Sequence, residues 1–194
     1  MGGVFTTLDV PSATATQARG ISNSGQIVGT YAGLGDQGVL DSSNTFSNID
    51  VPGAASTDAG GINDSGMIVG VYSDSNSLVH GFSYVNDTFS SPQISAAQQT
   101  LTIGINDLGQ IVGVSGSSGF LYAGGTFTTI NVPGASETAA EGINNAGQIV
   151  GFYLDSTGAA RGFLATPEFS APTVKVIVTT NSVGLSVLVD LHHR

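Results

Sequence analysis

The sequence predicts an all-β fold built from four similar antiparallel sheets. The 194 residues include 28 Gly, and only 9% of them are charged. Glycine inside a helix costs about 1 kcal/mol relative to alanine, whereas Val, Ile and Thr favour strands and Gly, Asn and Ser favour turns. A nearly identical decapeptide also occurs four times along the chain, beginning at Gly20, Gly61, Gly104 and Gly142.

The repetition extends beyond the decapeptide and divides each unit into four strands. The first strand ends in Gly-Ile-Asn, as at 61–63, and the second contains "IVG" and in three of the four units ends close to a tyrosine. The third is related to "HGFSY" at 80–84 and the fourth to "FTTINV" at 127–132. A period of about 40 residues with several strands per unit is typical of the blades of a β-propeller.

The copy "GINDSGMIVG" indicates how the first two strands are connected. The Asn63 side chain can bond to the backbone of the turn, and Gly66 can supply the left-handed conformation of a hairpin that contains a bulge. We therefore interpret the recurrent Asn and Asp residues as turn residues rather than ligands. The glycine of the second strand, Gly70 in this copy, predicts a close approach of two backbones.

The order of the strands predicts how the sheets close into a ring. The chain opens with a lone strand of the fourth type, Phe5–Val10, and its last unit ends on a strand of the third type at 161–165. We expect Phe5–Val10 to complete the last sheet, which gives a four-bladed β-propeller over residues 1–166, with four strands per blade and no open edge. This arrangement predicts a monomer. The alternative is an open half-ring that pairs with a second copy to make eight blades.

The stretch "GINDSGMIVGVYSDSNSLVHGFSY" resembles the HAF repeat of bacterial proteins that are expected to be extracellular. The resemblance covers essentially all of residues 1–166 and implies a secreted or surface-displayed repeat module, with no particular reaction. The His-x-Phe signature is complete only at His80, and Gln37, Ser118 and Arg161 replace the histidine elsewhere. The opening "MGGVFTTLDV" has no basic or apolar leader region, so the leader of a secreted form would lie outside this sequence.

Residues 167–194 lack the decapeptide and form a separate tail. The apolar stretches "VKVIV" and "LSVLVDL" predict a hairpin of Val174–Thr179 and Leu185–Leu191 that covers a blade edge or the mouth of the channel. The alternative is a cloning junction that is read out of frame.

Charge and composition exclude several classes of partner. The formal net charge is −10, and Arg19 and Arg161 are the two basic residues before the tail, too few to neutralise a series of phosphates. We therefore expect neither nucleic acid nor an anionic membrane as a partner. The absence of cysteine excludes disulfides and thiolate metal sites. No apolar run approaches the roughly 20 residues that span a bilayer.

The loops at one end of the predicted propeller gather its polar and aromatic residues. The candidate ligand-binding residues in these loops are Asp74, His80, Asp155, Tyr72 and Tyr153. The candidate metal ligands are Asp58, Glu137 and Glu141, with calcium the most suitable ion because it takes several oxygen ligands. Arg19 and Glu141 occupy equivalent positions, and we expect them to form an ion pair at the channel.

These features favour a non-enzymatic extracellular propeller that serves as a binding or structural module, with a cation in its axial channel. Its ligand would be a small molecule, a glycan or a protein. The sequence has no Gly-x-Ser-x-Gly nucleophile elbow and no phosphate-binding Gly-x-x-x-x-Gly-Lys loop. The alternative is a weak metal-dependent hydrolase, similar to phosphotriesterases or lactonases, with carboxylates at the channel mouth.

Overall fold

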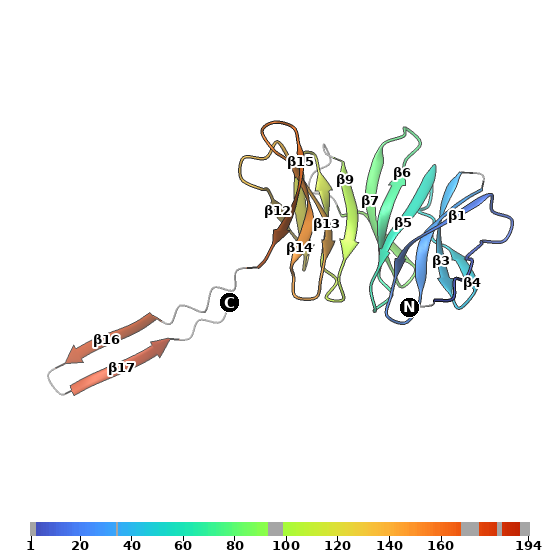
Figure 1. Cartoon of the computed structure of the whole chain (residues 1–194). Helices are drawn as coiled ribbons and strands as arrows, with labels where there is room; N and C mark the ends of the chain where they lie inside the picture. Colours follow the sequence, from blue (N-terminus) through green and yellow to red (C-terminus); the bar gives the residue numbers. More distant parts are fainter. Residues whose placement is uncertain (1–2, 34, 93–98, 168–174, 182–183, 191–194) are drawn as a thin grey trace.

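The computed structural model describes residues 3–33, 35–92, 99–167, 175–181 and 184–190, and these residues form strands and loops without a helix. Four antiparallel sheets follow one another along the chain and lie in a row (Figure 1). The chain is therefore all-β, as the sequence predicts.

The first three sheets have four strands each and the fourth has three, always in sequence order. Sheet 1 consists of β1 (Ala15–Ile21), β2 (Ile27–Ala32), β3 (Asp36–Ser42) and β4 (Thr45–Asn48). Sheet 2 consists of β5 (Ser56–Ile62), β6 (Ile68–Ser73), β7 (Val79–Val85) and β8 (Thr88–Ser90). Sheet 3 consists of β9 (Thr100–Ile105), β10 (Ile111–Ser115), β11 (Ser118–Ala123) and β12 (Thr126–Ile130). Sheet 4 consists of β13 (Glu137–Ile143), β14 (Ile149–Leu154) and β15 (Ala160–Ala165).

The row of sheets is not closed into a ring, so the predicted four-bladed propeller is not confirmed. Residues 3–10 belong to no strand, and the Phe5 side chain is 99% exposed. Within the part of the chain that the structure describes, strand β15 pairs with β14 alone, and sheets 1 and 4 lie at opposite ends of the row (Figure 1). The predicted pairing of Phe5–Val10 with the last sheet is therefore not formed within the structure.

The tail contains a separate antiparallel hairpin of β16 (Lys175–Asn181) and β17 (Gly184–Asp190). Its strands start and end close to the predicted bounds, although Val174 and Leu191 lie outside the described residues. Figure 1 draws the hairpin apart from the four sheets, and its expected role as the cover of a blade edge or channel mouth stays a prediction.

The turns between the first two strands of each sheet have the predicted chemistry. The Asn63 Oδ1 atom accepts hydrogen bonds from the Ser65 and Met67 backbone N–H groups, at 3.2 and 2.9 Å. Gly66 has a φ angle of 79°, which is the left-handed conformation that glycine adopts without strain. The turns of sheets 3 and 4 repeat this pattern with Asn106 and Asn144.

A bulge in the first strand of every sheet explains the recurrent glycine of the second strand. In sheet 2 the pairing of β5 with β6 shifts register between Ala59 and Gly61, so that Gly60 is the extra residue. A Cβ atom on Gly70 would collide with the Asp58 carbonyl oxygen and come within 2.9 Å of the Phe82 ring. The close approach predicted at this glycine is therefore confirmed.

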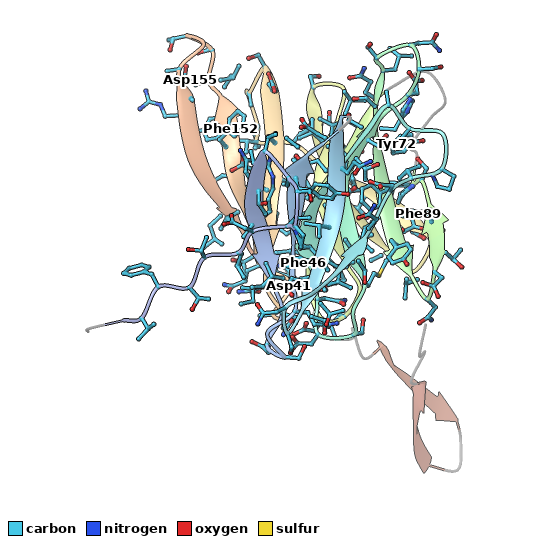
Figure 2. All side chains as sticks on the ribbon, turned by 90° about the vertical axis from the view of Figure 1, so that its right-hand side faces the viewer. Asp41, Phe46, Tyr72, Phe89, Phe152 and Asp155 are labelled. Atoms are coloured by element: carbon cyan, nitrogen blue, oxygen red, sulfur yellow. The ribbon has the colours of Figure 1, made fainter. Side chains whose placement is uncertain are left out.

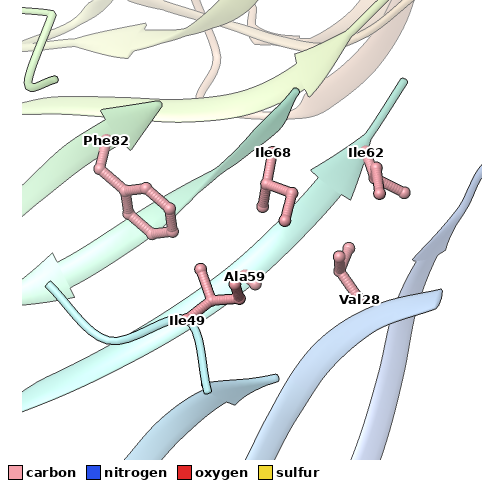
Figure 3. Close-up of a cluster of buried hydrophobic side chains, with 6 residues drawn as sticks. All are labelled: Val28, Ile49, Ala59, Ile62, Ile68 and Phe82. Carbon is pink, nitrogen blue, oxygen red and sulfur yellow. The ribbon is translucent and has the colours of Figure 1, made fainter. Parts of the chain in front are cut away.

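Apolar residues fill the spaces between neighbouring sheets. Between sheets 1 and 2, Val28 packs against residues of sheet 2 and of the loop that leads to it, and its partners in this buried cluster are Ile49, Ala59, Ile62, Ile68 and Phe82 (Figure 3). The equivalent valines Val69 and Val112 pack in the same way onto sheets 3 and 4. Sheets 1, 2 and 3 therefore each bury one face against the sheet that follows.

A series of hydrogen bonds, which we call the turn ladder, connects the turns of neighbouring sheets. The Asn23 backbone N–H donates to the Asp64 carboxylate at 2.7 Å, the Asp64 N–H donates to Asp107 at 2.9 Å, and the Asp107 N–H donates to the Asn145 side-chain oxygen at 2.9 Å. The Asn106 Nδ2 atom also donates to the Asn144 carbonyl at 3.0 Å. The turn residues therefore also hold each sheet to the next.

Candidate functional site

An ion pair connects sheets 1 and 2 at the bulge of β1. The register shift between Ala18 and Gly20 makes Arg19 the extra residue of that strand, and a bulge re-aims the side chain that it carries. The Arg19 Nη2 atom lies 2.8 Å from the Asp58 Oδ2 atom on β5. The Thr30 hydroxyl donates to the other carboxylate oxygen at 2.6 Å.

Two neighbouring cavities, which we call the cleft, share this ion pair. The first has a volume of about 260 Å³ and lies between sheets 1 and 2, and the second has a volume of about 400 Å³ and extends towards Thr102 of sheet 3. The side chains of the ion pair are about 44% and 32% exposed, so water and small molecules reach them. The principal polar and aromatic residues of the first cavity are Gln17, Thr30, Tyr31, Asp36, Ser56 and Tyr72.

Two tyrosines from adjacent sheets stand on the walls of the first cavity. The Tyr31 hydroxyl donates to the Asn48 side-chain oxygen at 2.9 Å, which fixes its ring. The Tyr72 ring lies against the His80 imidazole, with 5.1 Å between the ring centroids and a tilt of 30°. Tyr72, labelled in Figure 2, therefore brings the predicted residue His80 close to the cleft.

A side-chain hydrogen bond joins Asp74 and His80 at the connection between β6 and β7. The His80 Nε2 atom lies 3.1 Å from the Asp74 Oδ2 atom. The Asn76 and Leu78 backbone N–H groups donate to the other carboxylate oxygen, at 2.8 and 3.0 Å. The hydrogen bond with His80 is the largest cause that lowers the pKa of Asp74 below its ordinary value, and the backbone donors add to it.

Sheet 4 repeats this arrangement with Asp155, Arg161 and Tyr153. The Arg161 Nε atom lies 3.0 Å from the Asp155 carboxylate, and Tyr153 is the register partner of Arg161 across β14 and β15. Hydrogen bonds from Thr157 are the largest cause that lowers the pKa of Asp155, followed by the bond from Arg161. Asp155 lies far along the row from Tyr72 (Figures 1 and 2), so the five predicted ligand-binding residues form two clusters.

The three predicted metal ligands are not brought together. Asp58 pairs with Arg19 instead, and Glu137 and Glu141 lie on β13 of sheet 4. Within residues 3–33, 35–92, 99–167 and the tail strands, no group of three or more His, Asp or Glu side chains could hold a metal ion. The predicted pairing of Arg19 with Glu141 is wrong, because the bulge brings Arg19 to the neighbouring sheet rather than across a channel.

Sequence reasoning missed two residues of the cleft, Gln17 and Thr30. Gln17 lies shortly before the bulge of β1, and Thr30 lies directly before the tyrosine at the end of β2. The repeat makes both of these features obvious. Their signal in the sequence is a departure from the repeat: Gln17 stands where sheet 2 has Asp58, and Thr30 where sheet 2 has Val71. Among the described residues, none belongs to a helix long and apolar enough to cross a bilayer.

The comparison with solved structures gives a distant likeness. No family model matches the chain, and no curated protein matches it. Among solved structures, the chain is similar to the SapL1 lectin, whose structure was determined in complex with alpha methyl fucoside. The identity is 12%, the TM-score is 0.36, and the match covers 91% of this chain and 72% of the lectin. Similarity at this level assigns neither fold nor ligand, so the site is argued from its own residues.

Proposed function

We propose that the chain is a non-enzymatic binding module whose cleft takes a neutral ligand rich in hydroxyl groups, such as a sugar unit of a glycan. The observation that carries this proposal is the half-exposed ion pair of Arg19 and Asp58, which lies at the meeting point of the two cavities.

The charge of the ion pair favours a neutral ligand. The pair has no net charge, so a charged ligand would displace one partner and leave the other without compensation. Arg19 offers donors in a planar array and Asp58 offers acceptors. Adjacent hydroxyl groups of a sugar can accept from the first and donate to the second.

The walls of the first cavity suit the same class of ligand. Tyr31 and Tyr72 present ring surface beside polar groups, and aromatic rings of this kind bury the apolar faces of a ligand while the polar groups orient it. The hydrogen bond from Tyr31 to Asn48 and the contact of Tyr72 with His80 hold both rings in place before a ligand arrives. His80 and Asp74 then act as positioning residues for Tyr72.

The proposed architecture is a β-propeller in which each sheet is one blade. The packing of every sheet on its successor and the turn ladder support it. Two arrangements complete the ring: Phe5–Val10 of the same chain closes four blades, or a second copy supplies four more. The repeat pattern also supports membership of the HAF repeat class and an extracellular or surface location.

A calcium ion in the channel and a metal-dependent hydrolase are the alternative proposals. They rest on the carboxylates Asp58, Glu137 and Glu141 that the sequence singles out. Their test is turnover of ester and phosphotriester substrates, measured with calcium and with EDTA. Turnover that EDTA abolishes, and that Glu141→Ala also removes, would replace the binding proposal.

The binding proposal is tested with a glycan array followed by calorimetric titration of the best monosaccharide. We expect binding by the parent chain, at least tenfold weaker binding by Asp58→Asn, and unchanged binding by Asp155→Asn, which alters a carboxylate that is paired with Arg161 far from the cleft. Equal binding by the Asp58→Asn variant, or no glycan bound by a correctly folded chain, would overturn the proposal.

A further inference from the structure

The two ends of the row expose surfaces that are buried everywhere else in the repeat. At the sheet 4 end, Val150 is 49% exposed, whereas the equivalent valines of sheets 1, 2 and 3 (Val28, Val69 and Val112) are fully buried against the following sheet. Leu164 beside it is 62% exposed. At the sheet 1 end, Ile21 is 68% exposed, whereas its equivalent Ile62 is 8% exposed beneath Val28.

The amino-terminal segment contacts sheet 1 in the same way as the loops that lead into sheets 2 and 4 contact those sheets. The Val10 N–H donates to the Thr16 hydroxyl at 3.2 Å, and the equivalent bonds from Val51 to Thr57 and from Val132 to Thr138 are both 3.1 Å. The residues shortly before Val51 form β4, the outer strand of sheet 1, and those shortly before Val132 form β12, the outer strand of sheet 3. Residues 5–9 therefore leave sheet 1 in the direction of an outer strand for a sheet that precedes it.

Leu8 of this segment lines an apolar groove on the open face of sheet 1, with Ala18, Ile27, Val39 and Phe46. Its equivalent Ile49 is buried in the junction of sheets 1 and 2 (Figure 3). Asp41, labelled beside Phe46 in Figure 2, lines the same groove and is 6% exposed. Among the described residues, its Oδ1 atom is the one buried side-chain oxygen or nitrogen without a hydrogen-bond partner.

Sheet 4 lacks the strand and the neighbour that this segment and sheet 1 would provide. Among the described residues, none pairs with the outer edge of its last strand β15. A Cβ atom on Gly162 would lie 3.9 Å from the nearest atom, whereas on the equivalent Gly81 it would lie 2.7 Å from the Thr100 carbonyl oxygen of the next sheet. The space beside Gly162 is therefore wide enough for a neighbouring backbone.

The turn ladder also has two complementary ends. Each turn donates a backbone N–H to the side-chain oxygen of the next, from Asn23 through Asp64 and Asp107 to Asn145. In the described part of the chain, the Asn145 N–H has no acceptor and the Asn23 Oδ1 atom has no donor. A bond between these two groups would continue the ladder with the same chemistry.

We propose that two copies of the chain complete one ring of eight sheets. Sheet 4 of each copy docks on sheet 1 of the other, and residues 5–9 of each copy add the outer strand to β15 of the other. The Leu8 N–H would donate to the Gly162 carbonyl, as the Ile49 N–H donates to Gly38 at 3.0 Å. The interface repeats the three junctions that already exist within each chain.

The second copy is favoured over closure of the chain on itself because of the packing within the row. The junctions are close, because a Cβ atom added to Gly20 would lie 3.1 Å from the Gly60 carbonyl oxygen and from the Gly61 Cα. Bending the row into a four-sheet ring would change the angle at every junction, and close-packed interiors resist such changes. A second copy leaves all three junctions unaltered. The inference rests on the blade arrangement proposed above and is independent of what the cleft binds.

Disulfide trapping tests which copy completes the ring, in a chain that contains no other cysteine. A mixture of the Asn23→Cys and Asn145→Cys variants is expected to form a disulfide-linked dimer under mild oxidation, while each variant alone stays uncrosslinked. The double variant is expected to form a covalent dimer. An intramolecular disulfide in the double variant would overturn the proposal, because the chain would then close on itself. The Asp64→Cys/Asp107→Cys variant is the control for the turn geometry. Its two cysteines lie in neighbouring turns of one chain, so a disulfide between them shows that this geometry permits the bond.

Light scattering after gel filtration gives a second readout without cysteine. We expect the parent chain to have about twice the 19.5 kDa mass of one copy, and Val150→Asp to have the mass of one copy with an unchanged β circular dichroism spectrum. Leu78→Asp, which changes an exposed leucine in a turn of sheet 2, is expected to keep the double mass. A single-copy mass for the parent chain, or an open series of larger species, would overturn the two-copy ring.

Discussion

The guanidinium of Arg19 crosses the junction between sheets 1 and 2 and lies 2.8 Å from the carboxylate of Asp58. The pair joins two separate sheets, and it lies in the cleft rather than in the core. An ion pair that is this exposed contributes little to stability, about 1 kcal/mol or less. Its position is therefore better explained by the recognition of a ligand than by folding.

Replacing Arg19 is expected to impair binding without unfolding the chain. Arg19→Gln removes the charged donors, and a hydrogen bond to a charged group contributes about 1.5–3 kcal/mol, so the dissociation constant of a bound sugar should rise by about tenfold or more. Calorimetric titration measures the affinity, and thermal unfolding should shift little. Arg161→Gln breaks the comparable ion pair with Asp155 and should leave the affinity unchanged. A loss of affinity in both variants would contradict the assignment of the cleft.

The pKa of Asp74 is expected to depend on His80. The folded-state pKa lies below the ordinary value, so this carboxylate contributes stability above about pH 4 that is lost as the pH falls through the folded pKa. His80→Phe keeps a ring beside Tyr72 but removes the hydrogen bond, and the pKa of Asp74 should rise towards its ordinary value. Carbon NMR of the carboxyl group measures both values. Asp155 is the internal control and should titrate as before; an unmoved Asp74 would contradict the prediction.

The glycine in the second strand of each sheet is expected to tolerate no side chain. In Gly70→Ala the new methyl group would overlap the Asp58 carbonyl oxygen across the bulge, and overpacking of this kind lowers the free energy of unfolding by about 3 kcal/mol or more. Urea denaturation measures the change. Gly60→Ala is the matched control in the same sheet, because its Cβ would lie 3.7 Å from the nearest atom and should change the free energy by at most about 1 kcal/mol. Similar values for the two variants would show that the bulge does not impose this constraint.

The turn ladder is expected to depend on the amide group of Asn106. This side chain is 4% exposed, and its Nδ2 atom donates to the Asn144 carbonyl of the next sheet. Asn106→Asp replaces that donor with a carboxylate oxygen, so the free energy of unfolding should fall by about 2 kcal/mol or more. Asn76→Asp makes the same chemical change in an exposed turn and should have little effect in the same denaturation experiment. An unaffected Asn106→Asp variant would mean that the ladder bonds contribute nothing to stability.

Much of the fold could be predicted because the same turn and strand residues recur in four copies of the repeat. Asn63 and Gly66 specify their turn through hydrogen bonding and backbone conformation, which depend on neighbouring residues only. The strands follow from the alternation of such turns with β-branched residues. The closing of the ring could not be predicted in the same way, because Phe5–Val10 identifies the type of strand that is needed but not the molecule that receives it.

The candidate site was harder to predict because it is made where the sheets differ. The repeat indicates that residue 19 and Glu141 are equivalent, and this equivalence suggested that they meet. The bulge instead directs Arg19 to the adjacent sheet, where the partner is Asp58. Thr30 binds that carboxylate, and its signal in the sequence is only that it replaces the valine found at the equivalent position of sheet 2.

The turn ladder gives the row of sheets a polarity, since the backbone N–H donor is on the earlier unit and its side-chain acceptor is on the later one. A whole unit can therefore be deleted or duplicated without creating a junction of a new kind, provided that the cut falls at the same place in each copy. Gene duplication could lengthen such an array step by step, and circularly permuted versions that begin at a different unit should assemble with the same chemistry.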